Sequence, residues 1–237
     1  MIQILLFALL LAPAEGAGGR AFERAVKQVC EMEFISVKEV WQLRKKIKQR
    51  FAGRSVPYSL VGNIIGKVSH GHVNNLLRNW YFIPAEDREK IVCMFEQAGL
   101  GHLVFLSLYE SGAQVNDRSG AGAIGLFQIM PRTAELHCGI DLREELYDPV
   151  VNAACAIEIL KDKGVMENLA YGLVLYNGKL KSCPARDYFA CLQEKLATET
   201  DEKKKRQYLG SLMYVPNVML HQAIGEELIL GRDAALR

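Results

Sequence analysis

Two neighbouring segments carry most of the information on the fold and the chemistry of this chain. Residues 103–110 read Leu-Val-Phe-Leu-Ser-Leu-Tyr-Glu, an apolar run of helical length whose last residue, Glu110, is its only acid. Residues 119–131 read Ser-Gly-Ala-Gly-Ala-Ile-Gly-Leu-Phe-Gln-Ile-Met-Pro. We therefore expect an apolar helix that ends at a carboxyl group, followed by a loop too apolar and too rich in glycine to be an ordinary solvated loop.

A carboxyl group in that position is a candidate catalytic acid. Burial disfavours the charged form and raises the pKa, so Glu110 can hold a proton near neutral pH and deliver it to a leaving oxygen. Cleavage of a glycosidic bond requires such a donor. The competing interpretation is that Glu110 ends a core helix at a wet surface, which is the commoner situation for a single Glu. The loop favours the catalytic interpretation, because glycines let the backbone approach a ligand closely.

Gln128 and Met130 alternate around Ile129 and lead into Pro131, a residue that suits the first turn of a helix. We expect their side chains to face one side. The amide of Gln128 can exchange hydrogen bonds with sugar hydroxyls or an acetamido group, and Met130 offers an adaptable apolar surface. Each residue taken alone is more typical of packing than of binding.

Residues 110–134 resemble the catalytic core of the soluble lytic transglycosylases. The resemblance rests on Glu-Ser at 110–111, on Ser119, and on the long run from Gly122 to Ala134. It continues with Leu-Tyr-Asp-Pro at 146–149, Leu-Tyr-Asn-Gly at 175–178 and Tyr-Val-Pro-Asn-Val at 214–218. The similar region extends over residues 86–225.

This resemblance implies a mainly α fold, with a lysozyme-like helical catalytic domain and a smaller helical N-terminal segment. In the family, the Glu is the catalytic acid and base, the Ser and the Gln-x-Met pair contact substrate, and the Tyr-Asn segment lines the cleft. The matching positions are Glu110, Ser119, Gln128, Met130, Tyr176 and Asn177.

The resemblance also implies an enzyme. Its substrate would be the β-1,4 bond between N-acetylmuramic acid and N-acetylglucosamine in peptidoglycan glycan strands. The acceptor is the sugar's own C6 hydroxyl, so the product is 1,6-anhydro-N-acetylmuramic acid and neither an attacking water nor a second carboxylate is required. No cofactor is expected.

Two other functions stay open. A goose-type lysozyme-like hydrolase would use a second carboxylate, for which Asp117 is the nearest candidate. A wall-binding or secretion-scaffold protein would keep the cleft and lack activity.

Composition and charge limit the possible partners. The chain has 237 residues, half of them hydrophobic, which is enough for one substantial domain and an accessory piece. The formal net charge of +2 offers no global argument for nucleic acid. Binding to glycan strands would depend on local hydrogen bonds and stacking.

The N-terminal residues 1–14 form an apolar run that is too short to span a bilayer comfortably. We predict a signal peptide over residues 1–17, cleaved after Ala14 or Ala17. The alternative is an uncleaved anchor or a buried helix. The prediction implies an exported protein, periplasmic or extracellular, with no stable membrane insertion after cleavage.

An even number of cysteines in an exported chain suggests disulfides. The six are Cys30, Cys93, Cys138, Cys155, Cys183 and Cys191. Six thiols allow 15 pairings. We favour the two local pairs, 138 with 155 and 183 with 191, which leaves 30 with 93. No Cys-x-x-Cys spacing occurs, and His70-Gly71-His72 is the nearest metal candidate, so we expect no metal site.

The pattern of apolar residues predicts helices along most of the chain. Residues 18–84 are expected to form a helical accessory region, with amphipathic helices over 21–51 and loops with short helices over 52–84. The catalytic domain is expected over 85–237, with a helix capped by Asp148 and Pro149 and further helices over 166–176 and 200–223. The basic run 44–50 is interpreted as a solvated helix face.

Overall fold

A computed structural model describes residues 35–178 and 183–231 of the chain. The described residues are mainly helical, and two isolated β-bridges within residues 118–129 are the only strand-like pairings among them. The predicted fold class is therefore confirmed. The predicted signal peptide and Cys30 lie outside the described residues.

The α-helices are α3 (Val37–Phe51), α4 (Val61–Ile64), α5 (His70–Phe82), α6 (Ala85–Gln97), α7 (Leu106–Glu110), α8 (Pro131–Cys138), α9 (Pro149–Asp162), α10 (Leu169–Tyr176), α11 (Tyr188–Thr198) and α12 (Glu202–Gly225). Short turns of 3-10 helix are η1 (Tyr58–Leu60), η2 (Ile65–Lys67), η3 (Gly101–Leu103) and η4 (Arg143–Tyr147), and a π-helical turn, η5 (Glu226–Leu230), follows α12.

Several helices begin where local chemistry predicts. Asp148 caps α9 by accepting the N–H groups of Val150 and Val151 at 2.8 and 2.9 Å, and Pro149 occupies the first helical position. Helix α3 begins with a capping box between Ser36 and Glu39. These contacts satisfy backbone groups that a helix cannot satisfy within itself.

Three elements differ from the sequence prediction. Helix α5 is a regular helix of 13 residues in the region expected to form loops with short helices, because Trp80, Tyr81 and other apolar residues form one buried face on it. Helix α7 starts only at Leu106, after the 3-10 turn η3. Helix α11 has no counterpart among the predicted helices.

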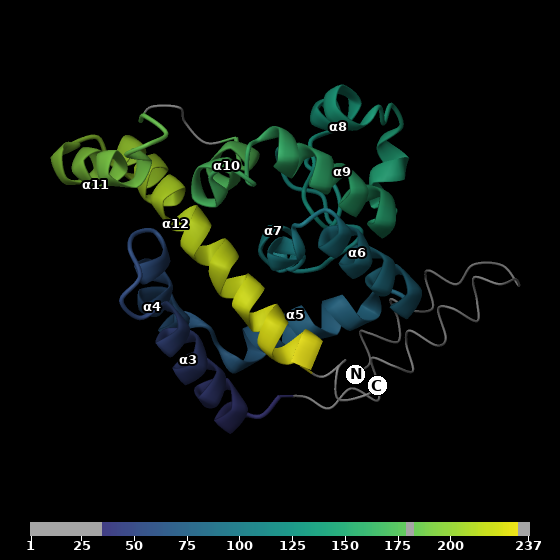
Figure 1. The fold of residues 1–237 in the computed structure, drawn as a ribbon, viewed down its shortest axis with the longest axis horizontal. Helices are drawn as coiled ribbons and strands as arrows, with labels where there is room; N and C mark the ends of the chain where they lie inside the picture. Colours follow the sequence, from purple (N-terminus) through teal and green to yellow (C-terminus); the bar gives the residue numbers. More distant parts are fainter. Residues whose placement is uncertain (1–34, 179–182, 232–237) are drawn as a thin grey trace, which may run out of the picture.

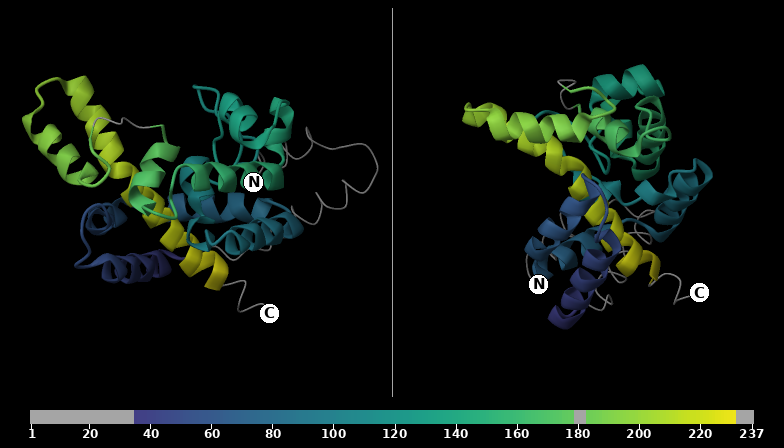
Figure 2. Two further views of the ribbon diagram at one scale, coloured as in Figure 1. Left: turned by 45° about the horizontal axis from the view of Figure 1, so that its top comes forward. Right: turned by 60° about the vertical axis from the view of Figure 1, so that its left-hand side comes forward.

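Helix α12 packs both on the N-terminal helices and on helices of the central region (Figure 1). It contacts α7, α10 and α11 and also α3, α4 and η1. Figure 2 shows from two further directions that it runs between the N-terminal helices and the helices of the central region. Residues 211–225 of α12 are almost all buried. The last predicted helix is therefore a core element.

Two of the predicted disulfides are present. Cys138 at the end of α8 is bonded to Cys155 of α9, and Cys183 is bonded to Cys191 of α11. Cys93 is an exposed free thiol on α6, and its predicted partner Cys30 lies outside the described residues.

The basic run of α3 is not simply a solvated face. Arg44 donates to the carbonyl oxygen of Val68, Lys46 pairs with Glu227 at 3.0 Å, and Arg50 pairs with Glu226. These contacts attach α3 to the rest of the fold. No helix in the described ranges is long and apolar enough to cross a membrane.

Candidate active site

Glu110 is the last residue of α7, and its side chain is half-buried. Tyr214 of α12 donates its hydroxyl to Oε1 of Glu110, and Tyr214 itself is only 1% exposed. The carboxyl group predicted from the apolar run is therefore met by a buried hydroxyl donor. A hydrogen bond to an ionised group is stronger than one between neutral groups.

The charge of Glu110 affects the pKa values of three tyrosines. Burial, and then the charge of Glu110, raises the pKa of Tyr214 and of Tyr176 well above the ordinary value. The pKa of Tyr109 is raised by the same two causes. These hydroxyls therefore stay protonated. In the described part of the chain, no other carboxylate contributes to these three shifts.

The loop after α7 is folded by hydrogen bonds between its own residues. Ser119 accepts the N–H of Ala123 on its hydroxyl at 2.9 Å and donates its own N–H to the Ala123 carbonyl at 2.9 Å. Ile124 and Ile129 exchange two backbone hydrogen bonds of 2.9 and 3.0 Å. The hydroxyl of Ser111 donates to the carbonyl of Leu126 at 2.8 Å and so joins the end of α7 to this loop.

Asn152 of α9 anchors the loop through hydrogen bonds of its side-chain amide. It is fully buried, its Oδ1 accepts the N–H of Phe127 at 2.9 Å, and its Nδ2 donates to the carbonyls of Ile124 and Leu146 at 3.0 and 2.9 Å. Gly125 crosses directly over this amide with φ of 78°. A Cβ at Gly125 would lie 2.4 Å from Asn152 Nδ2 and from the Leu146 carbonyl oxygen. Only glycine fits this position.

Tyr176 and Gln128 fix the second half of the loop. Tyr176 donates its hydroxyl to the carbonyl of Phe127 at 2.8 Å. Gln128 has a positive φ of 51°, and its Nε2 donates to the Gly125 carbonyl at 3.0 Å. The side-chain amide thus bends back on its own loop. This strained backbone, unusual for a residue other than glycine, is held by its surroundings.

Met130 and Asn177 differ in exposure. The side chain of Met130 is 41% exposed at the N-cap of α8, where an apolar group gains nothing from water. The Oδ1 atom of Asn177 is buried and has no hydrogen-bond partner among the described residues. A buried polar atom without a partner is uncommon in a folded protein.

The structure links three of the predicted site residues, Glu110, Tyr176 and Gln128, directly or through one loop. Glu110 and Tyr176 are electrostatically coupled, and Tyr176 is bonded to the loop that carries Gln128. No contact among the described residues links Ser119 directly to Glu110; its hydroxyl supports the loop. Tyr214 was not predicted as a site residue, although it lies in the last segment of the family resemblance.

His72 and His221 form a pair next to Tyr109. The Nδ1 atom of His221 lies 2.8 Å from the Asn217 carbonyl, so it carries the proton, and Nε2 accepts from Nε2 of His72 at 3.2 Å. Tyr109 packs on both His221 and Tyr214, with ring centroids 5.4 Å apart in each pair. Burial lowers the pKa of His221 to about 4. No sequence pattern pointed to this contact.

Other candidate sites are separate from this group. His70 contacts the Ile35 carbonyl and His72 contacts His221, so the two histidines do not converge, and no cluster of three metal-ligating residues occurs in the described ranges. A surface cavity of about 400 Å³ lies between α6 and α9. It is lined by Glu89, Lys90, Cys93, Met94 and Val150, none of them a predicted site residue.

Comparison with known proteins identifies one part of the chain. Residues 99–178, about a third of the sequence, match the family model of the transglycosylase SLT domain. The match contains Glu110, the glycine-rich loop and the Tyr176-Asn177 pair, and the helical fold agrees with the lysozyme-like class. No curated protein and no solved structure matches the chain.

Proposed function

We propose that this chain, which carries a transglycosylase SLT domain over residues 99–178, is a peptidoglycan lytic transglycosylase. It cleaves the β-1,4 bond between N-acetylmuramic acid and N-acetylglucosamine and forms 1,6-anhydro-N-acetylmuramic acid. The observation that carries the proposal is the contact between Glu110 and the buried hydroxyl of Tyr214. This contact supports the proposal because it gives the carboxyl group of the SLT match a fixed hydroxyl donor.

Glu110 serves as acid and then as base. Its carboxyl proton passes to the glycosidic oxygen, the bond from C1 of the muramic acid to that oxygen breaks, and the N-acetylglucosamine leaves with a hydroxyl group. The Glu110 carboxylate then takes the proton of the C6 hydroxyl, whose oxygen bonds to C1. The proton balance closes without water. Because Tyr214 donates to Oε1, the transferred proton belongs on Oε2.

The environment of Glu110 supports a mechanism with a single carboxylate. Tyr214, Tyr176 and Tyr109 surround it with protonated hydroxyls and aromatic rings, and no second carboxylate among the described residues acts on them. Retaining and inverting hydrolases use two carboxyl groups. The family resemblance therefore favours intramolecular attack by the C6 hydroxyl, and hydrolysis assisted by Asp117 is tested by the Asp117→Ala variant below.

The proposed substrate contacts come from the loop that follows Glu110 and from the Tyr176-Asn177 pair. Asn177 follows Tyr176 in the segment that lines the cleft in the family, and Met130 offers an apolar surface for a sugar face. Gln128 presents the remaining capacity of its amide, and Ser119 and Tyr176 shape the loop. Export by the predicted signal peptide would place the enzyme at the cell wall, in the periplasm or outside the cell.

The test is mass spectrometry of the muropeptides released from purified sacculi. The wild-type chain should release fragments that end in 1,6-anhydro-muramic acid, and Glu110→Gln should release none, because the amide keeps the shape and loses the transferable proton. Release of fragments with a reducing end would identify a hydrolase instead. Absence of release by folded wild-type protein, with retained binding to sacculi, would identify a wall-binding protein.

A matched variant separates the two enzymatic functions. Asp117→Ala removes the carboxylate that a hydrolase would need, while the backbone carbonyl of Asp117 still accepts the N–H of Gly125 at 2.9 Å. Near wild-type release of anhydro products by this variant is expected. Loss of product release on the scale of Glu110→Gln contradicts the single-carboxylate mechanism.

A further inference from the structure

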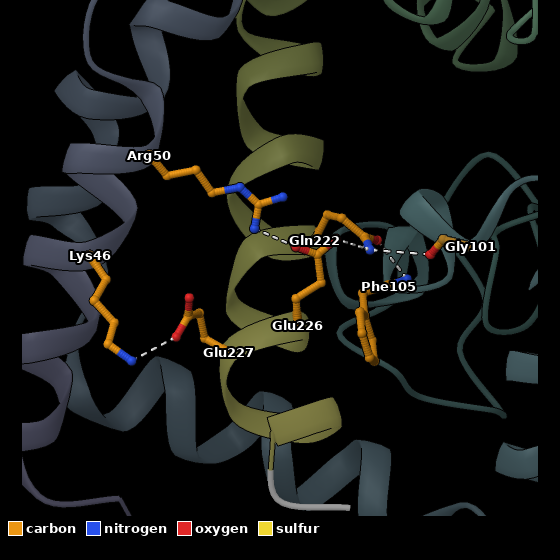
Figure 3. Close-up of polar contacts among 7 residues, drawn as sticks. All are labelled: Lys46, Arg50, Gly101, Phe105, Gln222, Glu226 and Glu227. Carbon is orange, nitrogen blue, oxygen red and sulfur yellow. Dashed lines mark hydrogen bonds and ion pairs between the residues drawn. The ribbon is translucent and has the colours of Figure 1, made fainter. Parts of the chain in front are cut away.

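Helix α7, which ends at Glu110, is held against α12 at both of its ends. At the C-terminal end, Tyr214 donates to Glu110. At the N-terminal end, Phe105 donates its backbone N–H to Oε1 of Gln222 at 2.9 Å (Figure 3). Gln222 is 3% exposed, so this hydrogen bond is shielded from water.

A helix of five residues needs such external support. Its first N–H groups have no partner within the helix, and a single turn is too short to be stable alone. The ring of Phe105 adds a steric contact. A Cβ at Gly225 would lie 2.2 Å from the ring, so the missing side chain of Gly225 is what lets Phe105 sit against α12. The start of α7 is therefore fixed against α12 by one ring and one hydrogen bond, and Trp80 packs on the same ring with centroids 5.1 Å apart.

The orientation of the Gln222 amide is set by its second partner. Nε2 of Gln222 donates to Oε1 of Glu226 at 2.9 Å, and the Gly101 carbonyl lies 3.5 Å from the same nitrogen. A carboxylate accepts and cannot donate, so Glu226 requires the nitrogen of the amide on its side and leaves the oxygen for Phe105. The other oxygen of Glu226 accepts from Arg50 of α3. Figure 3 shows these contacts as one continuous series from α3 to α7.

We propose that Gln222 is a positioning residue for Glu110, and that α3 sets the orientation of the Gln222 amide through Arg50 and Glu226. The inference rests on the proposed function, because it takes Glu110 as the catalytic group. The N-terminal helices then contribute to catalysis through the position of α7, without contact with substrate. When the hydrogen bond at its N-terminal end is lost, the one-turn helix α7 shifts, and Glu110 at its C-terminal end shifts with it.

The chain contains a matched control for this series. Lys46 of α3 pairs with Glu227 at 3.0 Å, one residue beyond Glu226. This ion pair joins the same two elements and is more exposed to solvent than the pair of Arg50 with Glu226, but it makes no contact with Gln222 (Figure 3). Its loss removes one attachment of α3 and leaves the amide orientation unchanged.

The main variant is Gln222→Leu, which leaves the buried N–H of Phe105 without an acceptor. We expect kcat on sacculi to fall about tenfold, since an orphaned buried donor has a cost of that order, while KM changes little. The comparison is made well below the unfolding temperature of the variant. Lys46→Gln should retain wild-type kcat and KM.

A reversal of the donor and acceptor tests the orientation. Gln222→Glu keeps an acceptor for Phe105 but places two carboxylates four residues apart on one helix, so kcat should fall. The double variant Gln222→Glu with Glu226→Gln restores one donor and one acceptor, and should recover most of the lost kcat. Arg50→Gln should lower kcat only about twofold to threefold, because its ion pair is partly exposed.

A measurement independent of turnover completes the test. Amide hydrogen exchange over residues 105–110 should be faster in Gln222→Leu and unchanged in Lys46→Gln. Wild-type kcat and wild-type exchange in a folded Gln222→Leu would overturn the inference, as would a reversed pair that recovers nothing. If the wild-type chain releases no product while exchange responds as expected, the proposed function fails and the structural contact stands.

Discussion

Residues 103–131 and helix α12 build the same site in different ways. The loop at 117–130 obtains much of its shape from partners a few residues away, such as Ser119 with Ala123. Asn152 and Tyr176 then hold it from helices α9 and α10, at separations of at most 49 positions. Helix α12 acts over long separations: Tyr214 reaches Glu110 across 104 positions, and Gln222 reaches Phe105 across 117. The first region therefore supplies the motif, and the second decides where its carboxyl group lies. The following predictions test this division.

The largest effect is expected from breaking the local region at Gly125. Gly125→Ala places a Cβ against Asn152 and forces a positive φ on a residue that resists it, so we expect a loss of about 3 kcal/mol or more in the free energy of unfolding. Thermal unfolding followed by circular dichroism measures this. Gly120→Ala is the control within the same loop, because nothing lies within 4 Å of its Cβ position. Equal stability of the two variants would contradict the close fit at Gly125.

The long-range region should respond to acid through His221. Burial lowers its pKa to about 4, whereas an unfolded chain binds the proton near pH 6.5. Between these values the unfolded state binds more protons, so stability falls as the pH drops from 6.5 to 4, by up to about 3 kcal/mol. Chemical unfolding at a series of pH values measures the slope.

The control for this pH dependence is a histidine outside the site. His221→Gln should flatten the dependence between pH 6.5 and 5, because the titrating group is gone. His102→Gln, which alters an exposed residue in η3, should keep the wild-type slope. A wild-type slope in His221→Gln would assign the acid sensitivity to other groups.

A change of one atom tests the contact between the two regions. Tyr214→Phe removes the hydroxyl that donates to Glu110 and keeps the buried ring, so we expect kcat to fall between about tenfold and a hundredfold with the fold retained. Steady-state release of anhydro-muropeptides measures it. Tyr208→Phe on the same helix should have no effect, since its ring is only half-buried and lies away from Glu110 in sequence and contacts. Full activity in Tyr214→Phe would remove this tyrosine from the mechanism.

The smallest effect is expected at a helix cap. Asp148→Ala removes the cap of α9, which carries Asn152, and should lower stability by about 1 kcal/mol and kcat by roughly twofold. Asp201→Ala removes a cap of the same geometry from α12, far from Tyr214 along the helix. It should lower stability by a similar amount and leave kcat unchanged. Loss of activity in both variants alike would show that the effect is only one of stability.

Much of the architecture follows from short-range patterns. The caps at Asp148 and Pro149, the helix start at Pro131 and the two local disulfides all involve residues near each other in sequence, and the structure contains them. Helix α5 was expected only as short helices between loops because its sequence contains Gly71 and three asparagines, which are weak helix formers. Burial of Trp80 and its neighbours outweighs that preference.

The sequence by itself determined the fold class, the SLT motif and Glu110 as the candidate acid, because periodicity and motif spacing are local properties of the chain. Only the tertiary structure decided that Tyr214 donates to Glu110, that His72 meets His221, and that Gln222 holds the start of α7. Each of these pairs joins residues more than 100 positions apart. Such contacts depend on how helices pack, and packing is set by the whole core rather than by any one segment.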